Sequence, residues 1–81
     1  GGTITISWPT YAECPSGFPL DSYEFTVNGG TFPNVSTFGA KTKSADIIID
    51  DNTNEVRVSY IVRCGDLASN PSEDLVISVD Q

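Results

Sequence analysis

Two cysteines are the side chains in this sequence whose chemistry depends most on where the fold places them. Cys14 lies in a segment rich in proline and glycine, and Cys64 follows a run of alternating apolar residues. A structural zinc site needs four nitrogen or sulfur ligands, and the sequence has no histidine and no third cysteine. A nucleophilic cysteine needs a neighbouring base, which no histidine can supply here. Two possibilities remain open: a crosslink or a pair of free buried thiols.

The acidic run after residue 49 is the candidate for a cation site. Asp50, Asn52 and Asn54 have the alternating spacing of the first ligands in a calcium-binding loop. The pattern then fails, because Glu55 stands where the loop requires glycine and Ile61 stands where it requires a bidentate glutamate. We therefore expect a polar turn, and no metal or other cofactor.

Catalysis by paired carboxylates would require two of them to face each other across a cleft, about 5–10 Å apart. Asp50 and Asp51 are neighbours in the expected turn, and Asp46 and Glu55 are surface candidates. A chain of 81 residues offers little depth for such a cleft. We expect no enzymatic activity.

Aromatic residues in the loops are candidates for binding a partner. Tyr11 and Phe18 lie on either side of Cys14, and Phe38 lies in the connection in the middle of the chain. Exposed rings in loops can stack on sugars or anchor a protein partner. The alternative, which we favour, is that these rings cover the ends of a thin core.

Two polar positions could also be used at the surface. Asn34-Val35-Ser36 matches the acceptor sequence for N-glycosylation, which would make Asn34 a glycan site in a eukaryotic secretory pathway. Arg63-Cys64-Gly65-Asp66 is similar to the Arg-Gly-Asp adhesion tripeptide, but the cysteine interrupts it. We therefore expect no integrin-type role, and Asp66 stays a candidate only as part of a binding loop.

The elements that must position these side chains are β-strands, because apolar residues recur with a period of two. The alternation is clearest over residues 3–8, where Ile4, Ile6 and Trp8 would face a core. Asn28-Gly29-Gly30 and residues 50–54 have the composition of turns. Further strands are expected over residues 23–27, 31–32, 45–49, 55–63 and 75–79. Loops are expected over residues 34–42, where one strand fragment could also form, and over residues 64–71.

This pattern predicts an all-β domain over residues 1–81, in which two antiparallel sheets of six to seven strands pack face to face. A chain of this length makes one domain at most. The side chains expected to face inward from the later strands are Tyr23, Phe25, Val27, Ala45, Ile47, Ile49, Val56, Val58, Tyr60, Val62, Leu75, Ile77 and Val79.

Composition narrows the functional classes. The formal net charge is -7, so the chain would repel nucleic acid and anionic lipid surfaces. Hydrophobic residues make up 38% of the chain, which is enough for a globular core and argues against disorder. No apolar run approaches the ~20 residues of a membrane helix, and no signal-like leader precedes the first strand. We expect neither a nucleic-acid partner nor membrane insertion.

The order of these features resembles a fibronectin type III domain. Residues 4–8 resemble the family's second strand, which ends in a core tryptophan, and residues 17–25 resemble its loop into the third strand. Residues 56–58 resemble the sixth strand, and residues 70–77 the start of the last. The family usually has a tyrosine just ahead of its sixth strand, and in this sequence that position falls near Asn54. Tyr60, further along the strand, would serve the core instead. The family's first edge strand is short or missing here. Hyalin-repeat and bacterial immunoglobulin-like modules, which are similar sandwiches, fit residues 58–70 nearly as well.

The resemblance implies a disulfide between Cys14 and Cys64. In a fibronectin-like sandwich, the loop after the second strand and the end of the sixth strand emerge at the same end, within reach of a crosslink. It would close a loop of about 50 residues and stabilise the fold by ~4 kcal/mol in the chain-entropy model. A disulfide in turn implies an oxidising location: extracellular, at the cell surface or on a virion surface.

The resemblance also implies a function. It is that of a non-catalytic structural, adhesion or protein-interaction module of a larger protein, whose partners are other proteins or neighbouring domains of the same chain. If the chain binds a partner, the end bearing Cys14, Phe18, Cys64 and Asp66 is expected to take part, because its loops are long and crosslinked. The alternative is a carbohydrate-binding module that uses one of the loop aromatics as a stacking platform for a glycan.

Overall fold

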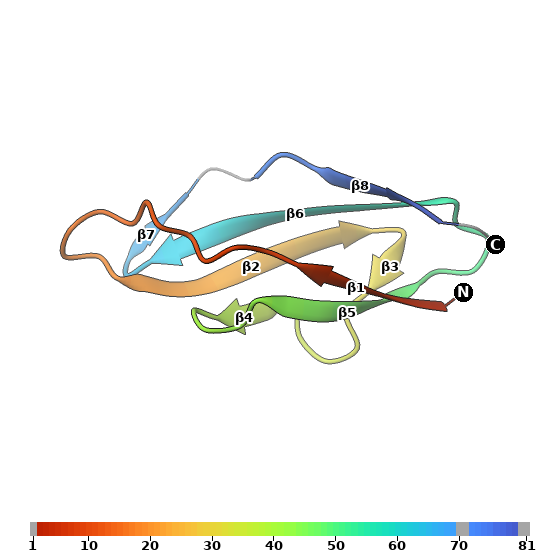
Figure 1. The fold of residues 1–81 in the computed structure, drawn as a ribbon, viewed down its shortest axis with the longest axis horizontal. Coiled ribbons are helices and arrows are strands. Elements are labelled where there is room, and N and C mark those ends of the chain that lie inside the picture. The colour runs from red at the N-terminus through yellow and green to blue at the C-terminus, as the bar shows by residue number, and fades with distance from the viewer. Residues whose placement is uncertain (1, 70–71, 80–81) are drawn as a thin grey trace.

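The structure of the chain, a computed structural model, describes residues 2–69 and 72–79. Over these residues every regular element is a β-strand, and the strands form two antiparallel sheets around one core (Figure 1). The all-β prediction is therefore confirmed. One sheet has the order β1-β5-β3; the other has the order β4-β2-β6-β7, and β8 also pairs with β6. The strands are β1 (Gly2–Ser7), β2 (Leu20–Asn28), β3 (Gly30–Thr31), β4 (Thr37–Gly39), β5 (Ser44–Ile49), β6 (Glu55–Cys64), β7 (Leu67–Ala68) and β8 (Leu75–Ser78).

The long strand β6 organises the second sheet. β2 pairs along one of its edges, and β7 and β8 pair in turn along the other. Between β7 and β8, the hydroxyls of Ser69 and Ser72 accept hydrogen bonds from the backbone N–H groups of Val62 and Tyr60, each at 2.9 Å. The backbone of β6 therefore keeps its hydrogen bonds where neither short strand covers it.

The core lies between the two sheets, and the alternation along the strands places its residues. Tyr23, Ile47 and Val56 are fully buried, and they come from β2, β5 and β6. Leu75 differs from the prediction, because it is 51% exposed, whereas Ile77 and Val79 pack against the core. The buried set is Ile6, Trp8, Tyr23, Phe25, Phe32, Ile47, Ile49, Val56, Val58, Val62 and Cys64.

An aromatic cluster joins the two sheets around Trp8. The Trp8 ring centroid lies 4.6 Å from that of Phe25 and 5.6 Å from that of Phe38. Tyr60 stacks on Phe25 at 5.0 Å, so it serves the core as expected. Ring pairs at these separations contribute about 0.5–1.5 kcal/mol beyond the area that they bury. Phe38 thus packs as part of the core, with its ring also against Phe32.

The segment predicted as a loop over residues 64–71 contains a strand, so that prediction is wrong. β6 turns at Gly65-Asp66 into β7, where Leu67 pairs with Cys64. Gly65 has a φ of 59°, as the first central residue of a type II′ hairpin turn requires. A Gly-Asp pair between two strands is itself a hairpin signal. The polar composition of the surrounding segment favoured a loop instead, which is why the strand was not predicted. Residues 70 and 71, where the family resemblance places the start of the last strand, lie outside the described residues.

The chain crosses from one sheet to the other at Gly29. β2 ends at Asn28, and β3 begins at Gly30 and pairs with β5 of the opposite sheet. Gly29 has a φ of 89°, and a Cβ at this position would lie 2.5 Å from the carbonyl oxygen of Glu55. The backbone conformation and the close approach to β6 both favour glycine here.

We expect Gly29→Ala to lower the free energy of unfolding by about 1–3 kcal/mol more than Gly17→Ala does. Gly17 has a similar φ of 85°, but a Cβ there would meet no atom within 4 Å. The conformational strain is therefore common to both variants, and the difference between them measures the clash with β6. Urea unfolding of both variants makes the comparison, and equal losses would contradict the close approach.

Candidate functional site at the disulfide-linked end

A disulfide joins the first loop to the end of β6, as predicted. Cys14 and Cys64 are bonded with an S–S distance of 2.04 Å and a Cα–Cα distance of 5.6 Å. Cys64 is the last residue of β6 and is buried, whereas Cys14 lies half-buried in the loop between β1 and β2. Figure 1 places this loop and the β6–β7 hairpin at the same end of the molecule, opposite the β5–β6 turn. The crosslink therefore fixes two loop segments side by side.

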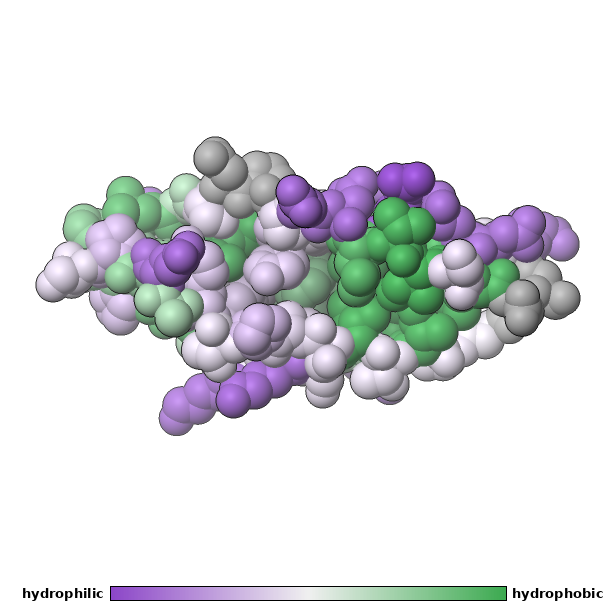
Figure 2. Space-filling view, turned by 45° about the horizontal axis from the view of Figure 1, so that its top comes forward, coloured by the Kyte–Doolittle hydropathy of each residue, from purple (hydrophilic) through white to green (hydrophobic). Residues whose placement is uncertain are grey.

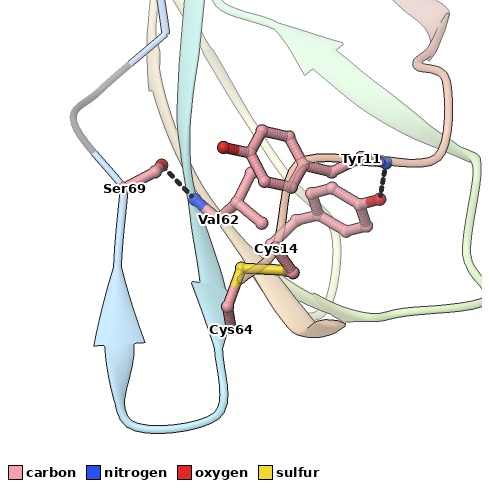
Figure 3. Close-up of a disulfide and its surroundings, with 6 residues drawn as sticks. Tyr11, Cys14, Val62, Cys64 and Ser69 are labelled. Carbon is pink, nitrogen blue, oxygen red and sulfur yellow. Dashed lines mark hydrogen bonds between the residues drawn. A yellow bond between two sulfur atoms is a disulfide. The ribbon is translucent and has the colours of Figure 1, made fainter. Parts of the chain in front are cut away.

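A hydrogen bond from Tyr11 gives the first loop a second attachment. The backbone N–H of Tyr11 donates to the hydroxyl of Tyr23 at 2.9 Å, as Figure 3 shows beside the disulfide. Tyr23 is fully buried, so its hydroxyl is a fixed anchor at the edge of the core. Two attachments three residues apart hold this part of the loop against the sheet. Tyr11 itself packs against the core and is half-buried.

Phe18 and Leu67 are the large hydrophobic side chains that are exposed among the described residues of this end. Phe18 lies over Gly65 of the hairpin, since a Cβ added to Gly65 would be 3.5 Å from Phe18 Cδ1. The N–H of Gly65 also donates to the carbonyl oxygen of Pro19 at 2.9 Å, which ties the loop to the turn. Phe18 is 37% exposed and Leu67 is 43% exposed. Leu67 is not among the site residues predicted from the sequence, although the Gly65-Asp66 hairpin signal would have placed it beside Cys64.

A hollow of ≈ 200 Å³ lies between the first loop and β7. This volume is below the ~300–1,000 Å³ that small-molecule sites occupy, and it suits a side chain of a protein partner better than a cofactor. Asp66 lies at the tip of the neighbouring hairpin and is exposed. The lining residues are Tyr11, Glu13, Pro15, Cys64, Leu67, Ala68 and Ser69.

An ion pair connects the two long strands next to the disulfide. Arg63 Nε donates to Glu24 Oε2 at 2.6 Å, and both side chains are partly exposed. This hydrogen bond is the main reason why the pKa of the Glu24 carboxyl lies below its ordinary value; partial desolvation acts in the opposite direction. The same contact raises the pKa of Arg63, which stays charged. Both groups are therefore charged over the physiological pH range.

We expect Glu24→Gln to remove a pH-dependent part of the stability. A carboxyl whose pKa is lower in the folded chain than in the unfolded chain stabilises the fold above its ordinary pKa, and this contribution is lost as the pH falls through the folded value. The Tm difference between wild type and Glu24→Gln should therefore be largest at neutral pH and shrink in acid. Glu13→Gln is the control, because Glu13 has no ion pair or hydrogen bond in the described part of the chain. A Tm difference that persists unchanged in acid would contradict the role of the ion pair.

The other predicted site residues lie away from this end. Phe38 lies in β4 and packs in the aromatic cluster, so among the three loop aromatics only Phe18 is exposed. Asn34 is exposed in the connection between β3 and β4. Asp50 and Asn54 are exposed at the two ends of the β5–β6 turn, where Asn52 has a φ of 61°. Within residues 2–69 and 72–79, no three histidine, cysteine, aspartate or glutamate side chains gather as metal ligands would.

Comparisons with models of protein families, with curated proteins and with solved structures find no match to this chain. Within the part of the chain that the structure describes, no helix is long and apolar enough to cross a membrane.

Proposed function

We propose that this chain is a non-catalytic structural and protein-interaction module of a larger extracellular, cell-surface or virion protein. The observation that carries the proposal is the disulfide-linked end, where the loop between β1 and β2 is fixed beside the β6–β7 hairpin. Leu67 is exposed there and lines a hollow of side-chain size, and Phe18 is exposed over the neighbouring turn at Gly65. A rigid apolar patch of this kind loses little conformational entropy when a partner binds. The disulfide fits an oxidising location.

We further propose that the sandwich is of the fibronectin type III or immunoglobulin-like type. Three pairings support this: β1 with β5 in one sheet, and β2 with β6 and β6 with β8 in the other. These correspond to the B–E, C–F and F–G neighbours of immunoglobulin-like sandwiches. Trp8 and Tyr23 also occupy the core, as the resemblance implies.

The interaction role is tested with three forms of the immobilised chain incubated with the secreted proteins of its host. These are wild type, the double variant Phe18→Ser with Leu67→Ser, and Val35→Ser. Val35 is 57% exposed in the connection between β3 and β4, so its variant controls for the loss of an exposed apolar side chain elsewhere. We expect wild type and Val35→Ser to retain the same proteins, and the double variant to retain them at least tenfold less, which corresponds to ~1.4 kcal/mol of binding free energy.

Two results would contradict this function. Equal retention by all three forms would show that the disulfide-linked end is not the binding surface. A glycan array on which wild type binds and Phe18→Ser does not would place the chain among carbohydrate-binding modules instead.

A further inference from the structure

The connection between β3 and β4 exposes an apolar side chain beside two hollows. Val35 in this connection is 57% exposed, the largest fraction among the large hydrophobic side chains of the described residues. One hollow, of ≈ 210 Å³, extends from the connection toward β5, and the other, of ≈ 400 Å³, extends toward β2. Phe32, Asn34 and Val35 line both hollows. The connection therefore forms the wall between them.

Another apolar area lies over β1 and β8, as Figure 2 shows. It includes a cleft of ≈ 170 Å³, and Ile6, Trp8 and Leu75 are among its lining residues. The resemblance to fibronectin type III domains places a first edge strand of the same chain beside β1, where it would cover this area. The resemblance places no further element over the β3–β4 connection, and the residues of the connection themselves indicate what covers it.

The connection contains the acceptor sequence for N-glycosylation, Asn34-Val35-Ser36. This modification joins an oligosaccharide to an asparagine that is followed two positions later by serine or threonine, with no proline between them. Asn70 is excluded by Pro71, and no other asparagine of the chain has serine or threonine at that distance. Asn34 is therefore the single acceptor in the sequence.

The fold leaves this acceptor accessible. Asn34, Val35 and Ser36 are all exposed, and Figure 1 shows their connection projecting from the side of the molecule, away from both sheets. The carbonyl oxygen of Ser36 accepts a hydrogen bond from the N–H of Phe25 at 2.8 Å, which holds the end of the connection against β2. Within residues 2–69 and 72–79, no hydrogen bond engages the side chains of Asn34 and Ser36. A glycan on Asn34 would therefore break no hydrogen bond of the fold.

The larger hollow has the chemistry of a surface for a sugar. Val27 and Val35 supply apolar contact for the C–H groups of a sugar ring. The hydroxyls of Thr26 and Thr31, both exposed residues, can donate to and accept from the sugar hydroxyls. The volume of this hollow lies within the range of ~300–1,000 Å³ that small-molecule sites occupy. Because Asn34 lines the hollow, the first sugar attached to its side chain would lie at the rim.

We propose that Asn34 carries an N-linked glycan whose first sugar packs against Val35 in the larger hollow. The side-chain nitrogen of Asn34 bonds to the anomeric carbon of an oligosaccharide that the eukaryotic secretory pathway supplies on a lipid diphosphate. The bond from that carbon to the diphosphate oxygen breaks, the lipid diphosphate leaves with the electron pair, and the nitrogen loses one proton. This site rests on the extracellular location in the proposed function, because the transferase acts on secreted chains.

The glycan would leave the proposed binding surface free. The two hollows beside the β3–β4 connection share no lining residue with the hollow at the disulfide-linked end. Glycosylated wild type and unglycosylated Ser36→Ala should therefore retain the same partner proteins. An unmodified Asn34 in a chain that still retains its partners would overturn the glycan site alone, whereas a glycosylated chain that retains none would overturn the interaction role alone.

The first test follows the mass of the whole chain after secretion from cultured eukaryotic cells, before and after treatment with a peptide N-glycosidase. We expect wild type to carry the mass of a glycan and to lose it on treatment, with aspartate left at position 34. Ser36→Ala should carry no glycan, and Ser36→Thr should carry one, because threonine retains the hydroxyl that the acceptor sequence requires. Both variants keep the backbone carbonyl that binds Phe25.

A new acceptor elsewhere controls for access of the transferase to the chain. Asn54→Ser turns the exposed Asn52 of the β5–β6 turn into a second acceptor. This variant should carry two glycans. Absence of a glycan from Asn34 in wild type and in Ser36→Thr would overturn the proposal, and a glycan on Asn52 alone in Asn54→Ser would do the same.

The second test measures the contact of the first sugar with the fold. Glycosylated chain is trimmed with an endoglycosidase that leaves the first sugar, or treated to remove the whole glycan. We expect the trimmed form to keep the Tm of the glycosylated form, and the fully released form and Ser36→Ala to melt about 4–8 °C lower, the scale of one such contact in a domain of this size. An equal Tm for the trimmed and released forms would overturn the packing of the sugar.

Two variants locate that contact. Val35→Ser keeps the acceptor sequence but removes the apolar side chain beside the sugar. Leu67→Ser removes an exposed apolar side chain at the disulfide-linked end instead. The Tm difference between trimmed and released forms should shrink by at least half in Val35→Ser and stay unchanged in Leu67→Ser. Because both side chains are exposed, neither variant depends on a change in the core. An undiminished difference in Val35→Ser would overturn the contact with Val35.

Discussion

Replacing both Cys14 and Cys64 with alanine is expected to lower the free energy of unfolding by about 4 kcal/mol. The two residues are separated by 50 positions, so the crosslink removes a large amount of chain entropy from the unfolded state. For a small domain, whose total stability is of the order of 5–15 kcal/mol, this is a large share. Alanine is preferred to serine here because Cys64 is buried and a serine would bring an unpaired hydroxyl into the core.

Urea unfolding under oxidising and reducing conditions measures this contribution. Wild type should lose most of the 4 kcal/mol on reduction, whereas the double alanine variant should be insensitive to reductant. The variant also controls for the effect of the reductant on the rest of the chain. A loss below about 1 kcal/mol would contradict the chain-entropy account, and would mean that the unfolded chain already holds the two segments together.

The same change should affect the disulfide-linked end more than the rest of the fold. With the crosslink removed, the hydrogen bonds from Tyr11 to Tyr23 and from Gly65 to Pro19 still attach the loop. Each contributes only about 0.5–1.5 kcal/mol. Amide exchange in this loop should therefore accelerate in conditions where β5 and β6 remain folded. The exposed Phe18 would then lose its fixed position beside the hairpin.

The strands could be predicted from the sequence because period-two alternation is a local property. Trp8, Tyr23 and Val56 could be assigned to the core from their neighbours alone, and all three are buried. Leu75 has the same local pattern, but it is exposed because it lines an open cleft between its own sheet and the segment that contains Ile6 and Trp8. That is a property of the assembled sheets, and no window of residues around Leu75 contains it.

The candidate site was predictable only in part, for a related reason. The pairing of Cys14 with Cys64 followed from the family resemblance, which supplied the long-range arrangement of two loops. Leu67 was not predicted, because its exposure beside Cys64 depends on a two-residue strand that three-dimensional pairing with β6 creates. Phe38 was a loop candidate, and its packing against Trp8 depends on contacts between residues 30 positions apart in the sequence.

Substituting Ile47 with alanine is expected to lower the free energy of unfolding by about 3–4 kcal/mol, and the same substitution at Ile48 by less than about 1 kcal/mol. Ile47 is fully buried between the sheets, whereas Ile48 is 47% exposed on the other face of β5. Ile47 also lies against the crossing point of the chain, since a Cβ added to Gly30 would be 2.6 Å from Ile47 Cγ2. Truncating it would leave a cavity that the backbone of β3 cannot fill without moving.

This pair of variants also tests the register of β5, because the two residues are adjacent and identical in type. The intrinsic strand preference that is lost is the same at both positions, so the difference between the variants reports burial alone. A slip of one residue in the pairing of β5 with β1 would exchange the faces of Ile47 and Ile48. Chemical unfolding of the two variants side by side is the measurement. If Ile48→Ala proved the more damaging change, the pairing Ile4↔Ile47 would be wrong.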